Sequence, residues 1–423
     1  MRSDTGGNLY TIRRNAILLA AGLVAQSGMI QLAVALGTVT LVSVTGVQGI
    51  LGLGPAVFLI AGAIAVGPAG RLSDRVGRMP VIRGGFVLGI IGPAVTAAGC
   101  GARSGVLVFA GLGLCGAAQS IVLLSRAASA EMFPPARRAR GMSIVLFGVV
   151  SGAVWGPLVF GPMFSGRDLT PHELVTPWLA AGAFTLAGFL LSFGVRPDPK
   201  LLSLRYAAPG TDEAPPAPVR EILRRPGVAT AMVAAVASFA VMVGVMNLAG
   251  YVAVGHGHAH GDVFTIISIH IVGMYGLILF IGDVVERMGR RRAMVIGLVV
   301  MAVSNAGLVS LESIAGMSLC LFGLGLGWCL SYVAATTELV DLARASERGR
   351  LIGATDLLSS FCGAALALGG GVVYTGAGGS VSLALTAAGL ATLAAAWVAG
   401  NRPALLPSDA GGRLSAASPY EDL

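Results

Sequence analysis

The segment Gly70–Arg78, which reads GRLSDRVGR, has a counterpart at Gly282–Arg290, which reads GDVVERMGR. Both contain an acidic residue followed by Arg, one variable residue, Gly and Arg. Gly77 of the first segment corresponds to Gly289 of the second, 212 positions later and about half of the 423-residue chain away. A repeat with this offset predicts two halves of like structure, related by a parallel duplication.

Each copy of the motif predicts a tight, charged turn between two helices. Gly permits the reversal, and the carboxylate can accept hydrogen bonds from Arg or from a helix N-terminus. Anchoring by positive charge alone is the simpler interpretation, but it requires no fixed acid and Gly spacing. We therefore expect a conformational switch made by Gly70, Asp74, Arg75, Gly77, Arg78, Glu286, Arg287, Gly289 and Arg290.

The composition predicts a chain surrounded by lipid. Hydrophobic residues make up 55% and charged residues 11%, with a mean hydropathy of +0.83, which excludes a water-soluble fold of this size. Apolar runs long enough to span roughly 30 Å of hydrocarbon predict twelve transmembrane helices. They lie at 16–42, 49–70, 79–99, 105–127, 141–164, 176–195, 228–253, 263–284, 293–311, 314–337, 350–374 and 379–399.

The basic residues predict the orientation. Of the 28 Lys and Arg, only Arg103 and Arg167 fall in loops assigned to the outer side, so both termini are expected in the cytoplasm. The net charge of +8 is scattered between apolar runs, which argues against a nucleic-acid partner. The five Cys have no CxxC spacing, so no zinc ribbon or disulfide framework is indicated. The expected organisation is a first bundle at 1–195, a linker at 196–227, a second bundle at 228–400 and a tail at 401–423.

The repeated loop resembles the signature of the major facilitator superfamily. The loop Glu131–Gly141, with its weaker counterpart at Glu338 and Glu347–Arg350, extends the likeness. The resemblance implies an all-α membrane protein with two pseudo-symmetric six-helix bundles that rock around a central site. It also implies a monomeric transporter in a bacterial cytoplasmic membrane, with no cofactor and no enzyme activity, whose partners are the bilayer and a small molecule or metal ion.

The cargo is predicted from soft and polar side chains deep in the spans. Met242 and Met246 lie one helical turn apart on the seventh span, and His270 and Met274 on the eighth. At ~1.5 Å per residue, both pairs fall roughly 10 to 17 Å below the outer surface. Three thioethers and a neutral imidazole favour Cu(I), so we expect a copper site.

This MxxxM and HxxxM pattern resembles the CcoA-like (CalT) copper importers of the superfamily. The resemblance implies that the four residues are copper ligands and that copper is the transported substrate. Core packing of Met and a proton relay at His270 are the alternatives. Between the two spans, His256, His258 and His260 form a Gly-rich outer tract that is either a metal-capture site or a polar turn.

Other polar or soft side chains predict the rest of the substrate cavity. The candidates are Gln26, Met29, Gln119 and Asn247, although interhelical hydrogen bonds or packing explain most such residues. We expect a structural role for Asp356 near the cytoplasmic end of its span. The glycines and prolines of span 141–164 resemble the motif of drug–proton antiporters, so drug efflux is the rival function. A related branch of the copper group imports riboflavin, which makes small-molecule uptake a further alternative.

Overall fold

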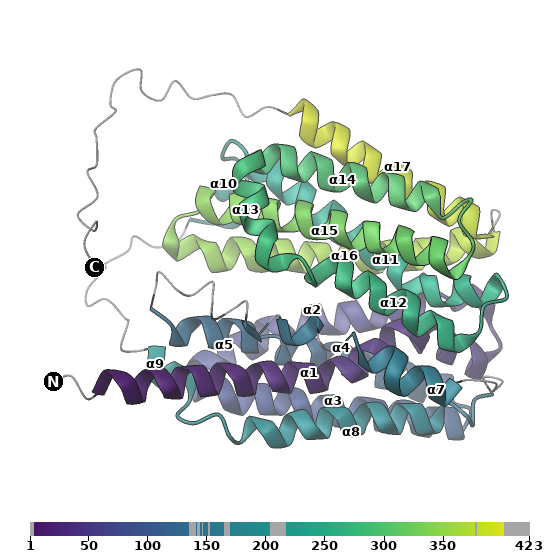
Figure 1. Cartoon of the computed structure of the whole chain (residues 1–423), viewed down its shortest axis with the longest axis horizontal. Helices are drawn as coiled ribbons and strands as arrows, with labels where there is room; N and C mark the ends of the chain where they lie inside the picture. Colours follow the sequence, from purple (N-terminus) through teal and green to yellow (C-terminus); the bar gives the residue numbers. More distant parts are fainter. Residues whose placement is uncertain are drawn as a thin grey trace.

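All regular elements of the described chain are helices, which confirms the predicted all-α class. The computed structural model describes residues 4–134, 141, 144–145, 147–150, 153–164, 170–203, 217–376 and 379–401. Figure 1 shows the helices in two groups that follow the order of the chain, the first half below the second.

The first half packs mainly within itself: α3 lies against α4 and α8, α1 against α8, and α2 against α4. Its elements are α1 (Asp4–Thr45), η1 (Gln48–Ile50), α2 (Leu53–Val76), α3 (Arg78–Gly101), α4 (Gly105–Val122), α5 (Ser125–Met132), η3 (Gly156–Phe160), α7 (Gly161–Phe164) and α8 (Val175–Ser192).

The second half repeats this arrangement, with α14 against α15 and α17, α12 against α15, and α11 against α15, α16 and α17. Two short helices precede it, α9 (Pro199–Ser203) and α10 (Val219–Ile222). The long helices are α11 (Val228–Gly255), α12 (His260–Tyr275), α13 (Ile278–Met288), α14 (Arg290–Gly307), α15 (Ile314–Leu342), α16 (Ala345–Gly376) and α17 (Gly379–Gly400).

Length and composition support ten of the twelve predicted spans. Nine helices of the described residues are apolar and long enough to cross a bilayer, and the bent pair α12 and α13 forms a tenth. The predicted span 141–164 lies partly outside the described residues. α14 covers the predicted span 293–311, but its first turn consists of Arg290, Arg291 and Arg292.

The predicted span 263–284 is not one straight helix. α12 ends at Tyr275, α13 begins at Ile278, and their axes differ by 55°. Leu277 at the break leaves the helical conformation, with φ −100° and ψ 5°, whereas Gly276 keeps it, with φ −62° and ψ −33°. A Cβ at Gly276 would lie 2.6 Å from the carbonyl oxygen of Val272, so glycine permits this close approach.

The halves touch closely at the helix ends that the arginine distribution places outside. α1 meets α11, α2 meets α16, and α12 meets η3 and α7. A Cβ at Gly52 would collide with the backbone of Ala367 on α16, and a Cβ at Gly250 with the carbonyl oxygen of Ala35 on α1. Glycine therefore permits backbone contact between the halves at two places.

Polar and aromatic contacts complete this outer closure. Gln31 Nε2 on α1 donates to Ser268 Oγ on α12 at 2.8 Å. The ring of Phe264 stacks on those of Phe160 and Phe164, with centroid distances of 5.6 and 5.5 Å. The structure thus represents a state in which the outer ends of the halves are closed against each other.

Candidate functional site

A tight turn at Gly77 joins α2 to α3, as the motif predicts. Gly77 has φ 104° and ψ 165°, a conformation essentially confined to glycine. Arg78 donates two hydrogen bonds to Glu131 at 2.9 and 2.8 Å and one to Asp74 at 2.6 Å. Asp198 accepts the backbone N–H of Arg78 at 3.1 Å. The turn therefore ties together α2, α3, α5 and the start of the linker.

The second copy of the motif is built with different acids. Gly289 again has positive φ, at 87°. Arg290 lies 3.1 Å from Glu338 and also pairs with Asp341, both on α15. Glu286 is exposed and forms no ion pair within the described ranges. The acid of the second motif therefore does not take the position that Asp74 takes in the first.

The remaining motif residues are less constrained. A Cβ added at Gly70 would have no heavy atom within 4 Å, so packing does not require glycine there. Arg75 and Arg287 are exposed. The tight turns at Gly77 and Gly289 are those that the motif predicts. The switch role of the whole set stays a prediction.

A further ion pair fixes the linker to the second half. Arg225 donates to both oxygens of the buried Glu347 on α16, at 2.6 and 2.9 Å. Glu347 also accepts the backbone N–H of Arg344 at 3.1 Å. The hydrogen bonds and the negative charge of Glu347 raise the pKa of the Arg225 guanidinium above its ordinary value. This pair therefore holds the end of the linker against α16.

His270 on α12 is buried against α15. Its Nδ1 lies 2.6 Å from the carbonyl oxygen of Leu321, and because a carbonyl can only accept, Nδ1 carries the hydrogen. Its Nε2 is buried and has no hydrogen-bond partner among the described residues. The imidazole is thus held in the way that second-shell carbonyls commonly orient a ligating histidine.

The methionines of the predicted copper site lie on the same two helices. Met242 and Met274 are buried, and Met246 is half-buried. Met274 packs toward α15, since a Cβ at Gly325 would lie 3.1 Å from its Cγ. α11 and α12 touch each other, but each packs more extensively against α15. The convergence of the four side chains on one ion stays a prediction.

The outer histidines face separate partners. His256 Nε2 lies 3.1 Å from Ser380 Oγ, and His258 Nε2 lies 2.5 Å from the carbonyl oxygen of Glu312. His260 begins α12, and its side chain is outside the described part of the chain. Among the described side chains, no group of three or more His, Cys, Asp or Glu could hold a metal ion. Metal capture by the whole tract stays a prediction.

The four predicted cavity residues have different surroundings. Gln26 is buried against α3, and neither atom of its amide has a hydrogen-bond partner within the described ranges. Met29 is in the hydrophobic core, and Gln119 is half-buried. Asn247 donates to the carbonyl oxygen of Val243 on its own helix at 2.9 Å. Their role in a common cavity stays a prediction.

A polar contact between the halves was not expected from the sequence. Arg126 Nη2 on α5 lies 3.7 Å from Asp356 Oδ2 on α16, and the Tyr332 hydroxyl donates to Asp356 Oδ1 at 2.6 Å. The Arg126 and Asp356 side chains are 39% and 35% exposed. The pair therefore presents accessible charge where the two halves face each other.

Sequence reasoning missed Arg126, although a signal was present. It is the sole charged residue from position 105 to 130, within an otherwise apolar span. Charged residues inside spans are costly and commonly mark substrate or ion pathways. The structural role expected for Asp356 agrees with its contacts, but the contacts also reach the other half.

Aromatic rings surround this polar contact. Trp328 and Tyr332, one turn apart on α15, stack with centroids 5.2 Å apart and ring planes 18° apart. Tyr275 meets Trp328 edge-on at 5.7 Å, and Phe239 lies 6.1 Å from Tyr332. Trp328 Nε1 is buried with no hydrogen-bond partner among the described residues. The group combines flat apolar surface, a free donor and nearby opposite charges.

Most of the chain matches a known transporter family. Residues 16–368 match the model of the Major Facilitator Superfamily. The chain belongs to the major facilitator superfamily. It is 30% identical over 384 residues to the uncharacterized MFS-type transporter YdeG of Bacillus subtilis, covering 87% of this chain and 86% of that protein. This superfamily member is therefore a multi-pass membrane transporter.

Two further likenesses concern sequence and fold. The riboflavin transporter RfnT of Brucella anthropi is 27% identical over 352 residues, covering 82% of this chain and 85% of that protein. A partially occluded, inward-open structure of the xylose transporter XylE of Escherichia coli has a TM-score of 0.72 at 14% identity, covering 96% of this chain and 100% of that chain. The latter likeness shows the fold.

Proposed function

We propose that this transporter carries a planar, aromatic organic solute of the riboflavin class. The observation that carries the proposal is the stacked pair Trp328 and Tyr332 beside the Arg126–Asp356 contact between the halves. Planar heteroaromatic rings stack on such surfaces, and stacking contributes about 1–3 kcal/mol per ring. The 27% identity with the riboflavin transporter of Brucella anthropi supports the same class.

Polar groups at the same place suit the edges of such a ring. The Trp328 N–H can donate to a ring carbonyl oxygen, which would satisfy a buried donor. Arg126 and Asp356 offer a donor and an acceptor from opposite halves. Because such a solute would contact both halves at once, its transport can be coupled to the rocking motion of the two bundles.

Uptake of radiolabelled riboflavin into cells that cannot make it tests the proposal. Trp328→Leu is expected to reduce uptake about tenfold through loss of stacking. Trp397→Leu is the matched control, because Trp397 is 52% exposed and its helix α17 packs mainly against α14 and α11 rather than α15. Equal uptake by both variants, at equal amounts of folded protein, would exclude Trp328 from the substrate site.

Copper import is the second candidate, and the oriented imidazole of His270 favours it. Its Nε2 is buried and has no hydrogen-bond partner within the described ranges, as expected for an atom reserved for a ligand. Under this proposal Met242, Met246 and Met274 supply thioether ligands to Cu(I).

Copper accumulation distinguishes the two candidates. His270→Leu and Met246→Leu should abolish copper uptake, whereas Met301→Leu, a buried methionine on α14, should not. Unchanged copper content in all three variants would remove the metal proposal. If drug efflux were the function, deletion of the protein would raise drug sensitivity and change neither copper nor riboflavin content.

A further inference from the structure

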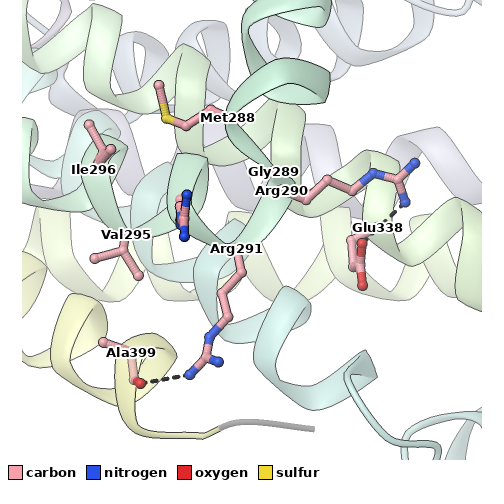
Figure 2. Close-up of a pocket in the computed structure, with 9 residues that line it drawn as sticks. Met288, Gly289, Arg290, Arg291, Val295, Ile296, Glu338 and Ala399 are labelled. Atoms are coloured by element: carbon pink, nitrogen blue, oxygen red, sulfur yellow. Dashed lines mark hydrogen bonds and ion pairs between the residues drawn. The ribbon is translucent and has the colours of Figure 1, made fainter. Parts of the chain in front are cut away.

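A basic hollow lies at the cytoplasmic end of the second half. It has a volume of about 820 Å³ and is lined by Arg290, Arg291 and Arg292, by Glu338, and by the apolar side chains of Met288, Val295 and Ile296, with Gly289 and Ala399 completing the wall. Figure 2 shows Arg290 directed toward Glu338 and Arg291 directed toward Ala399, with Val295 and Ile296 on the side of the view away from Glu338. Three arginines and one acid leave the wall with an excess of positive charge.

The three arginines differ in how far their charge is compensated. Arg290 is paired with Glu338 and Asp341. Arg291 donates to the carbonyl oxygens of Val398 and Ala399 at 3.1 and 2.6 Å. These bonds provide donors for free carbonyl groups at the end of α17, but they do not neutralise the charge of Arg291. Arg292 is exposed and forms no hydrogen bond or ion pair within the described ranges.

The first half shows what an anion does at the equivalent place. The backbone N–H groups of Arg78 and Met79, which begin α3, donate to the carboxylate of Asp198 at 3.1 and 2.9 Å. Their counterparts 212 positions later are Arg290 and Arg291, which begin α14. A negative group at the start of α3 is thus part of the structure of the first half.

The second half has no such carboxylate among the described residues. Arg290 and Arg291 donate to described acceptors through their guanidinium groups, and no described side chain accepts from their backbone N–H groups. The start of α14, which lines the hollow, therefore has no anion among the described residues. Arg291 and Arg292 add positive charge there that the first half lacks, since it has Met79 and Pro80 instead.

We infer that this hollow binds the phosphate of an anionic phospholipid from the cytoplasmic leaflet. Arginine and free helix N–H groups bind phosphate oxygens. The apolar wall matches the start of the acyl chains, and Ile296 is 41% exposed beside the arginines. A soluble phosphate would use the charge but leave this apolar surface in water, so the lipid is the ligand that uses both.

Retention of phosphatidylglycerol by the purified full-length protein tests the inference. The protein is equilibrated with mixed micelles of phosphatidylglycerol and phosphatidylcholine, and bound lipid is counted by native mass spectrometry. Arg292→Gln removes a charge with no partner within the described ranges, so the fold should be unaffected. We expect roughly fivefold weaker retention of phosphatidylglycerol, because each arginine near the membrane surface contributes about that factor.

Arg71→Gln is the matched control. Arg71 is exposed at the cytoplasmic end of α2 and has no ion pair or hydrogen bond with any described residue, so its loss should leave retention unchanged. Inorganic phosphate added in excess should fail to displace the lipid. Equal retention by wild type and Arg292→Gln, or full displacement by inorganic phosphate, would overturn the inference.

Discussion

Replacing Gly52 by Ala should disfavour closure of the outer side. Gly52 has φ −78° and ψ −9°, a conformation that alanine adopts freely, so the substitution strains no backbone. Its Cβ would nevertheless collide with the backbone of Ala367 and with Cα of Leu368 on α16. Backbone cannot move aside as a flexible side chain can, so the two halves must separate at this point.

The size of the effect follows from the contact. Overpacking by one methyl group typically costs about 1–3 kcal/mol. The cost arises only when α2 and α16 touch, so it applies to the closed state and not to a state in which the outer ends are apart. The ratio of closed to open molecules should therefore fall roughly 5- to 150-fold.

Labelling of a cysteine at position 33 measures this ratio. Ala33 is buried and lines a small space between the halves together with Asn247, so Ala33→Cys, in a chain whose five cysteines are replaced, should react with a maleimide only after opening. Gly49→Ala is the matched control, since a Cβ there meets no heavy atom within 4 Å. Equal labelling rates in Gly52→Ala and Gly49→Ala would refute the reasoning.

Three further outcomes are expected. Gly77→Ala should lower the free energy of unfolding by about 1–3 kcal/mol because φ is 104°, measured by denaturant unfolding in detergent. A double-mutant cycle of Arg78→Ala and Glu131→Ala should give a coupling free energy of about 1 kcal/mol, because two hydrogen bonds join these partly buried groups. Removing the charge of Arg126 or of Asp356 should reduce transport, and exchanging the two residues should restore much of it, as measured by uptake.

Controls accompany these outcomes. Gly84→Ala on α3 meets no heavy atom within 4 Å and should leave stability unchanged or raised. If the effects of Arg78→Ala and Glu131→Ala on the free energy of unfolding were additive, the two side chains would have no coupling free energy. Failure of the exchanged pair, with normal amounts of folded protein, would show that the charges act separately rather than as a pair.

The membrane class and the repeat could be predicted from the sequence because they depend on local properties. Apolar runs of about twenty residues are required to cross a bilayer whatever their neighbours are. Gly77 and Gly289 could be identified because a positive φ favours glycine at a turn. The bend after Tyr275 and the three arginines that begin α14 depart from this simple pattern, the first through the non-helical backbone of Leu277 and the second through charge at a helix end.

The sequence by itself determined that this protein is a duplicated helical transporter, since hydrophobic length and repeated turns act within single segments. Only the tertiary structure decided which deep side chains meet. Arg126 and Asp356 form an ion pair although they are 230 positions apart in the sequence. Asp198 accepts a hydrogen bond from Arg78 at the start of α3, 120 positions earlier. The rotation of each helix about its axis depends on packing against all its neighbours. The spacing of residues along one helix therefore cannot specify which residues of another helix they contact.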